Sequence, residues 1–374
     1  MMEATRQGIE TRAAAPASAT RRPKVGLLVP LIEGTMAGDS ARWADLLAYA
    51  RRAEALGYDS LWLSDHLLFR LAGREDQPVG MWEGWSVLAG LAAATTRITL
   101  GTFVTCTGFR NPALLAKMAA TVDEISDGRL VLGLGAGWHE PEFDAFGYPF
   151  DHRVSRFEEA FTIIRSLIQD GHVDFEGTYH RARDCELRPR GPRAGRLPLL
   201  IGSNGPRMLR AAAPYVQAWN SDWTNRPGEI PPLRERVDAA CLDVGRDPST
   251  LERTAGVVID LPVRDPARDG RASVSGATAP GTDASRPATG SPEELAELLR
   301  GYLAEGITHV QTWIDPSTPA GLEWFAQVLD ILDRDDHIST PERFRNGVSP
   351  HVVLDRSRPG SAVKALTAQA PRNG

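Results

Sequence analysis

Short apolar runs alternate with helical patterns along the chain from Lys24 onward. The runs are rich in residues that favour β-structure, and turn residues separate them from the helical segments. Eight runs predict strands, at residues 24–30, 60–65, 98–104, 130–136, 198–203, 218–223, 253–262 and 309–314. Strands that alternate with helices are typical of a parallel sheet wrapped by helices.

The segments between these runs carry helix signals. Four residues have the i, i+3, i+4, i+7 spacing of one apolar helix face: Trp43, Leu46, Leu47 and Ala50. Asn111 and Pro112 predict an N-cap followed by an N1 proline, and Ser291 with Glu294 predicts a capping box. Glycines that follow apolar helical patterns predict three helix ends, at Gly57, Gly128 and Gly306.

The fold class predicted from these elements is α/β. Eight strand and helix units in roughly 310 residues indicate a (β/α)8 TIM barrel over residues 23–336, with the active site at the C-terminal strand ends. A doubly wound open sheet is the alternative. Residues 173–187 alternate like an added hairpin, whereas residues 263–290, rich in Ala, Gly, Ser, Pro and Thr, predict a long flexible loop before the seventh helix. A lid is the other interpretation of that loop.

Composition narrows the class of protein. Residues 1–22 predict a disordered tail and residues 337–374 an irregular extension, and no segment approaches the roughly 18 apolar residues of a membrane span. The net charge is −6, with both signs interspersed, which disfavours nucleic acid and membrane surfaces as partners. Three cysteines without CxxC spacing favour a reducing, cytoplasmic location, and they are Cys106, Cys185 and Cys241. We therefore expect a small organic molecule as substrate.

An ionisable pair, Asp65 and His66, closes the second strand at the rim where barrel enzymes hold catalytic groups. An imidazole titrates near neutral pH, and a neighbouring carboxylate fixes its tautomer. We expect His66 to be the catalytic acid or base and Asp65 to support it. The alternative is that Asp65 only caps a loop.

The third and fourth strands end in small residues. Thr102 to Gly108 predicts a bulge where backbone approaches a flat ligand. Gly133 to Glu140 is a glycine-rich turn, but we expect no helix directly behind it because Pro141 follows, which disfavours a dinucleotide fingerprint. His139, Glu140 and His152 lack a standard ligand spacing, so no metal site is predicted.

The fifth strand runs through Gly202, Ser203, Asn204 and Gly205 into a predicted helix. Free N–H groups and the helix dipole make such a terminus an anion site, and glycines let a phosphate approach the amides. An ordinary Ser/Asn cap is the other interpretation.

Taken in order, these segments resemble the luciferase-like monooxygenase superfamily over about residues 24–335. The stretch RNPALLAKMAATVDEISDGRLVLGLGAGW is most similar to the coenzyme F420-dependent branch. The resemblance implies a barrel in which the ring of the deazaflavin F420, or of FMN as the alternative, lies over the C-terminal strand ends. It also implies that homodimers are common.

The resemblance carries over to particular positions. Val104 and Thr105 match residues near a non-prolyl cis peptide that backs the ring. The wall beside the ring matches Gly135, Ala136, Gly137 and Trp138. The phosphate loop matches Gly202, Ser203, Asn204 and Gly205.

The family's sugar-phosphate dehydrogenases have a glutamate in the place of Trp138 and an asparagine near Pro141, and this chain has neither. The leading hypothesis is hydride transfer between F420 and an organic substrate, with His66 moving the proton. A two-component FMN monooxygenase fed by a separate reductase is the alternative, and a flavin-binding protein without catalysis is a third. Two interpretations stay open for four tryptophans, which either line the substrate pocket or pack in the core: Trp43, Trp62, Trp82 and Trp85.

Overall fold

The computed structural model describes residues 22–36, 40–70, 76–263 and 286–339. Most of the predicted tail (1–22), insertion (263–290) and C-terminal extension (337–374) lies outside these residues. Arg22 is an exception, because its guanidinium donates a 2.8 Å hydrogen bond to Asp59. The last helix also runs to Ser339, past the predicted boundary at residue 336.

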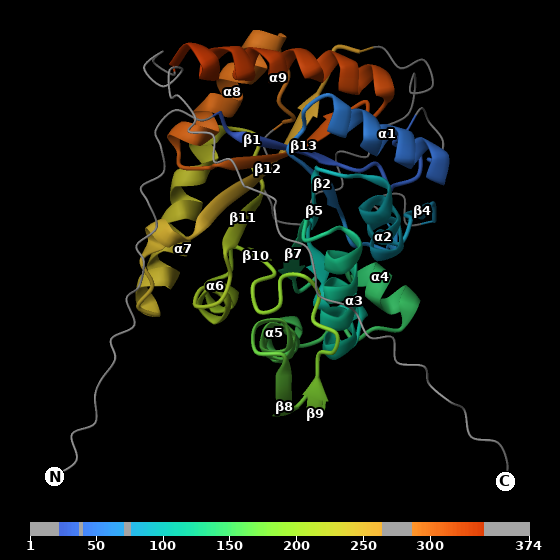
Figure 1. Cartoon of the computed structure of the whole chain (residues 1–374), viewed down its shortest axis with the longest axis vertical. Helices are drawn as coiled ribbons and strands as arrows, with labels where there is room; N and C mark the ends of the chain where they lie inside the picture. The colour runs from blue at the N-terminus through green and yellow to red at the C-terminus, as the bar shows by residue number, and fades with distance from the viewer. Residues whose placement is uncertain (1–21, 37–39, 71–75, 264–285, 340–374) are drawn as a thin grey trace, which may run out of the picture.

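Eight parallel strands form a closed barrel (Figure 1). They are β1 (Lys24–Leu28), β2 (Ser60–Leu63), β5 (Thr99–Thr102), β7 (Leu130–Gly135), β10 (Leu199–Gly202), β11 (Ala218–Trp223), β12 (Glu252–Asp260) and β13 (His309–Asp315). The sheet runs β10-β11-β12-β13-β1-β2-β5-β7, and β7 pairs back with β10. This closure confirms the predicted (β/α)8 barrel and excludes the open doubly wound sheet.

Helices surround the barrel, as Figure 1 shows. They are α1 (Trp43–Ala55), α2 (Gly84–Ala94), α3 (Pro112–Ile125), α4 (Glu140–Phe146), α5 (Arg153–Gln169), α6 (Pro206–Ala212), α7 (Ile230–Asp243), α8 (Pro292–Ala304) and α9 (Pro319–Ser339). In the described part of the chain, no helix is both long and apolar enough to cross a bilayer.

The predicted helix boundaries are confirmed. The Asn111 side chain accepts hydrogen bonds from two backbone amides of α3, and Ser291 and Glu294 form the capping box of α8. The three C-terminal glycines have positive φ angles, of 89° at Gly57, 76° at Gly128 and 85° at Gly306.

The predicted apolar face of α1 is wrong at its first residue. Leu46 and Ala50 are buried, but Trp43 is 45% exposed. Trp43 begins the helix and lies over Gly90 of α2 from outside, where a Cβ on Gly90 would come within 2.6 Å of the indole. Tyr49 and Ala53 complete the buried face instead.

Short strands lie in the connections. The predicted hairpin is confirmed as β8 (His172–Glu176) and β9 (Arg181–Glu186), which pair antiparallel. The loop after β2 contains β3 (Leu68–Phe69) and β4 (Val79–Gly80), and β6 (Thr105–Cys106) follows β5 and pairs with β7. Single 3-10 turns occupy Thr107–Phe109, Pro227–Glu229 and Pro248–Thr250.

The barrel interior is filled around Trp62. Its indole occupies the space that a Cβ on Gly101 would need, at 2.3 Å, and its Nε1 donates to Ser60 Oγ at 2.7 Å. The hydroxyl of Ser60 also lies 2.7 Å from Nε2 of the buried His309. These three buried side chains therefore fill part of the barrel interior.

Candidate active site

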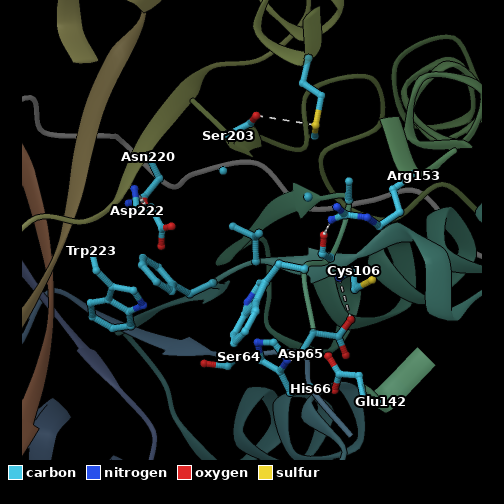
Figure 2. Close-up of a pocket in the computed structure, with 18 of the residues that line it drawn as sticks. Ser64, Asp65, His66, Cys106, Glu142, Arg153, Ser203, Asn220, Asp222 and Trp223 are labelled. Atoms are coloured by element: carbon cyan, nitrogen blue, oxygen red, sulfur yellow. Dashed lines mark hydrogen bonds and ion pairs between the residues drawn. The ribbon is translucent and has the colours of Figure 1, made fainter. Parts of the chain in front are cut away.

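A cavity of about 300 Å³ lies at the C-terminal ends of the barrel strands. Its walls come from the ends of β2, β5, β7, β10, β11, β12 and β13 and from the connections that follow them (Figure 2). Volumes of this order suit a small-molecule or cofactor site. The position is the one that the barrel predicts for an active site.

His66 lines this cavity and is held by a carboxylate that the sequence analysis missed. Its Nδ1 lies 2.8 Å from Oε1 of Glu142, which is buried in α4. The other oxygen of Glu142 accepts the Leu67 backbone N–H at 2.8 Å. Since a carboxylate only accepts, Nδ1 carries the hydrogen and Nε2 of the neutral ring keeps its lone pair. In the described residues, Nε2 has no hydrogen-bond partner.

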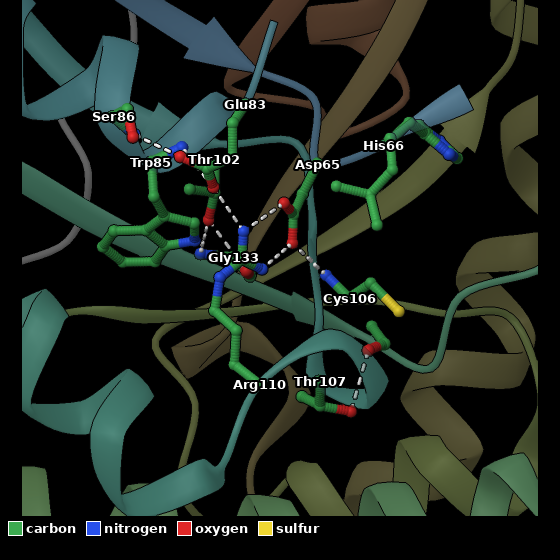
Figure 3. Close-up of polar contacts among 12 residues, drawn as sticks. Asp65, His66, Glu83, Trp85, Ser86, Thr102, Cys106, Thr107, Arg110 and Gly133 are labelled. Carbon is green, nitrogen blue, oxygen red and sulfur yellow. Dashed lines mark hydrogen bonds and ion pairs between the residues drawn. The ribbon is translucent and has the colours of Figure 1, made fainter. Parts of the chain in front are cut away.

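Asp65 has a different partner from the one expected. Its carboxylate accepts two bonds from Arg110, at 2.6 and 2.9 Å, and one from the Cys106 backbone N–H at 2.9 Å. Figure 3 shows this carboxylate turned toward Arg110 and away from His66. Asp65 therefore organises the backbone of the third strand, and Glu142 takes the place predicted for it beside His66.

The third strand breaks where a bulge was predicted. The Phe103–Val104 peptide bond is cis, and the chain resumes as β6 at Thr105. The Val104 side chain lines the cavity, and Thr105 is buried beneath it. A Cβ on Gly135 or on Gly202 would come within 2.7 or 2.8 Å of a Val104 methyl group. The glycines at these two strand ends thus make room for Val104.

The fourth strand supplies one wall of the cavity. Gly135, Ala136, Gly137 and Trp138 all line it. Gly137 has φ 75°, which favours glycine, and the Trp138 ring lies edge-on to His66 at 5.5 Å between centroids. The structure thus brings these four predicted residues together with His66.

The expectation that no helix follows this strand is wrong. Helix α4 begins at Glu140, with Pro141 in its first turn. Proline lacks only an N–H that is unpaired there anyway, so it is favoured at that position. The short helix matters because it delivers Glu142 to His66. His139 accepts the Arg70 backbone N–H at 3.0 Å, and burial lowers the pKa of His139.

The loop after the fifth strand is only partly at the cavity. Gly202 and Ser203 line it, whereas Gly205 is exposed at the start of α6. The amide of Asn204 is turned inward and donates to the Ser221 carbonyl at 2.9 Å. A second hollow adjoins this side, and Arg153 and Val154 line both.

Other candidate groups take structural roles. Cys106 is buried, and burial raises the pKa of its thiol, which disfavours the reactive thiolate form. Of the four tryptophans considered for the substrate pocket, Trp62 and Trp85 are core residues and Trp43 and Trp82 are exposed. The cavity is lined instead by Trp138, Trp223 and Trp313. Among the described residues, no group of three His, Cys, Asp or Glu side chains could hold a metal ion.

Comparison with known proteins identifies the class. Residues 24–263 match the luciferase-like monooxygenase family, and the chain belongs to that family. Phthiodiolone/phenolphthiodiolone dimycocerosates ketoreductase of Mycobacterium tuberculosis is 33% identical over 220 residues, which cover 54% of this chain and 57% of that protein. The 5,10-methylenetetrahydromethanopterin reductase of Archaeoglobus fulgidus is 30% identical over 214 residues, or 57% and 59% of the two chains. The chain thus spans little more than half the length of these relatives.

Solved structures share the fold. An F420-dependent secondary alcohol dehydrogenase, bound to an F420-acetone adduct, has a TM-score of 0.66 and 20% identity, covering 83% of this chain and 99% of that one. A monooxygenase from Streptomyces bottropensis has a TM-score of 0.65 and 21% identity, covering 83% and 98%. These two similarities show the shared barrel fold; one of the two proteins is named as F420-dependent and the other as a monooxygenase.

Proposed function

We propose that this protein is an oxidoreductase that transfers a hydride between the deazaflavin F420 and an organic substrate. The observation that carries the proposal is the His66–Glu142 pair, which places an oriented imidazole in the wall of a barrel-end cavity. When bound, F420 supplies the hydride chemistry, and the protein supplies geometry and proton transfer.

The residues of the cavity fit a flat ring system. Val104 and Ala136 present apolar surface, and the glycines beside Val104 leave no side chains projecting from those strand ends. We propose that these residues and Gly137 hold the ring, while Gly202 and Ser203 lie toward the phosphate. Asn204 and Gly205 would then act through the backbone of the loop rather than through side chains.

His66 would move the proton that accompanies the hydride. Glu142 fixes the Nδ1 hydrogen, so Nε2 is the atom available to take a proton from a substrate hydroxyl or, once protonated, to return it to a carbonyl. Trp138, edge-on to the imidazole, limits the positions that the ring can adopt. Glu142 is a positioning residue in this account.

A basic rim favours F420 over FMN. The adjoining hollow of about 370 Å³ is lined by Arg153 and Arg207, and F420 carries an acidic oligoglutamyl tail that FMN lacks. Arg207 pairs with Glu158, so Arg153 is the stronger candidate for contact with the tail. The two matching relatives above are named as reductases, which also agrees with hydride transfer.

The second candidate is an FMN-dependent monooxygenase that receives reduced flavin from a separate reductase. The fold similarity to a monooxygenase from Streptomyces bottropensis supports this alternative. A homodimer and a cytoplasmic location remain proposals in either case.

Anaerobic turnover tests the choice. The purified protein would be mixed with F420 and a panel of secondary alcohols, and in reverse with reduced F420 and the matching ketones. We expect a change in F420 absorbance that His66→Asn abolishes while F420 binding persists. Turnover that needs reduced FMN and oxygen would instead support the monooxygenase, and turnover unaffected by His66→Asn would overturn the proposed role of His66.

A further inference from the structure

Asp222 is an acidic side chain of the cavity that the proposed proton transfer does not use. It lies near the end of β11, and the register between β11 and β12 shifts between Asn220 and Trp223. Asp222 has φ 68°, a left-handed conformation that is uncommon for residues other than glycine. Its backbone N–H donates to Oδ1 of Asn220 at 2.8 Å, which fixes the irregular turn. The bulge thereby directs the side chain into the cavity (Figure 2).

The carboxylate of Asp222 differs from the other acids around the cavity. Asp65 is neutralised by Arg110, and Glu142 bonds to His66 and to backbone. In the described parts of the chain, no other side chain forms a hydrogen bond or ion pair with the Asp222 carboxyl group, whose hydrogen-bond partner is the backbone of Trp223. Burial raises the pKa of Asp222, and the opposing effects of the Trp223 backbone and of His66 are smaller. A buried carboxyl group that has no cationic side chain bonded to it, in a ligand cavity, marks a functional candidate.

Three aromatic rings line the same cavity as this carboxyl group. The ring centroids of Phe103 and Trp223 are 5.1 Å apart, and those of Trp223 and Trp313 are 6.0 Å apart. All three rings line the cavity. Indole rings attract cations through their quadrupole, most strongly where water is excluded. A carboxylate beside such rings suits a positive charge better than a neutral hydroxyl group, which would gain only a hydrogen bond.

The Arg153 guanidinium also lines the cavity, and the wall at Gly137 holds it. Arg153 donates to the Gly137 carbonyl at 2.6 Å and lies over the Phe150 ring, 4.2 Å from its centroid. In Figure 2 it lies on the opposite side of the cavity from Asp222. His66 is also separate from Asp222 in that view, so a substrate could contact both at different atoms.

We propose that Asp222, together with the rings of Trp223 and Trp313, forms a subsite for a protonated amine of the substrate. This inference rests on the proposed function for the reaction that the substrate undergoes. The subsite adds the chemical class of that substrate, an amine. A bound ammonium group would favour the charged form of Asp222, because an opposite charge within a few ångströms favours ionisation.

Binding to the protein without cofactor tests the subsite directly. The probes are benzylammonium and its neutral isostere benzyl alcohol, titrated against the tryptophan fluorescence of the cavity. We expect benzylammonium to bind at least about tenfold more tightly than benzyl alcohol, which corresponds to about 1.4 kcal/mol. Asp222→Asn should abolish that preference. Asparagine tolerates positive φ well, so this variant keeps the backbone conformation.

Asp127→Asn is the matched control. Asp127 also has a positive φ, of 54°, but it lies in the exposed turn after α3. The Asp127→Asn variant should bind benzylammonium and benzyl alcohol with the affinities of the wild type. Equal binding of the two probes, undiminished benzylammonium binding by Asp222→Asn, or no benzylammonium binding to the wild-type protein would each overturn the proposal.

Failure of the amine subsite can be distinguished from failure of the proposed F420 reaction. If benzylammonium binds as expected but neither F420 nor FMN binds, the subsite stands and the proposed reaction fails. If F420 binds and turns over while the Asp222 preference is absent, the reaction stands and the subsite fails.

Discussion

Nδ1 of His66 lies 2.8 Å from Oε1 of Glu142, although 76 residues separate the two in the chain. The pair joins the end of β2 to helix α4, which follows β7. Glu142 is 1% exposed and its second oxygen is held by the Leu67 amide, so the carboxylate is fixed on both sides. A histidine with Nδ1 held in this way presents Nε2 to the cavity in one tautomer.

We predict that Glu142→Gln lowers turnover by about tenfold or more, within the range that acid–base catalysis contributes. The amide can still accept the Leu67 bond, but it no longer stabilises a protonated His66. Cofactor affinity should change little, so the loss would appear in kcat rather than in cofactor binding. Steady-state kinetics with parallel cofactor titration measure both.

Glu140→Gln is the control for that experiment, because Glu140 lies on the same helix but is exposed. It should leave turnover unchanged. If Glu142→Gln were as active as Glu140→Gln, the positioning role of Glu142 would be wrong.

The packing of Val104 against glycine gives a second prediction. Gly202→Ala places a Cβ 2.8 Å from a Val104 methyl group, and valine is stiff at χ1, so Val104 must move. We expect F420 affinity to fall about tenfold or more, since a displaced wall disturbs the whole ring site. Val104→Ala in the same chain should restore much of the affinity.

Gly228→Ala is the matched glycine substitution, because nothing lies within 4 Å of the added Cβ. Calorimetric titration of the wild type and these three variants would show whether the loss of affinity follows the clash. A Gly202→Ala protein that binds F420 like the wild type would contradict the assigned role of Val104.

The Asp65–Arg110 pair gives a prediction about stability. Arg110→Ala leaves the buried Asp65 carboxylate without its partner and should destabilise the fold by roughly 3 to 5 kcal/mol. Arg52→Ala, which breaks only an exposed pair with Glu323, should leave the unfolding midpoint almost unchanged. Urea unfolding compares them, and equal midpoints for the two variants would show that Asp65 does not depend on Arg110.

His309 makes stability depend on pH. Burial lowers the pKa of His309 from 6.5 to about 3, so the folded protein holds it neutral while the unfolded chain takes up a proton. The contribution of neutral His309 to the free energy of unfolding is therefore fully present above pH 6.5. It is lost as the pH falls from 6.5 toward 3. The slope is about 1.4 kcal/mol per pH unit within that window.

The measurement is urea unfolding at several pH values for the wild type and His309→Gln. In His309→Gln, the free energy of unfolding should depend less steeply on pH between 6.5 and 3. His172→Gln, on the exposed hairpin, should keep the pH dependence of the wild type. An unchanged slope in His309→Gln would rule out His309 as its source.

Periodicity predicted the barrel because each strand and helix is a local pattern, and all eight predicted strands are present. His66 was also predictable, since it ends a strand at the rim. Glu142 was not, because its contact with His66 depends on how two distant connections meet in space. Its place in the turn after the glycine-rich strand was the available signal.

Sequence patterns did not predict the direction of two acidic side chains or the tryptophans that line the cavity. Asp65 was assigned to its sequence neighbour, but its side chain points toward Arg110, which is far away in the chain. Asp222 carried no sequence signal because its direction depends on a bulge and a positive φ. The tryptophans of the cavity come from the ends of later strands and not from the early helices.

Titration of the wild-type protein with F420, in parallel with FMN, tests the central claim most directly. Trp138, Trp223 and Trp313 line the cavity, so a ring bound there should quench their fluorescence. We predict saturable quenching by F420, weaker quenching by FMN, and a shift of the F420 titration of Gly202→Ala to about tenfold or more higher concentration. Absence of binding by both cofactors would contradict the account, and tighter binding of FMN would favour the monooxygenase.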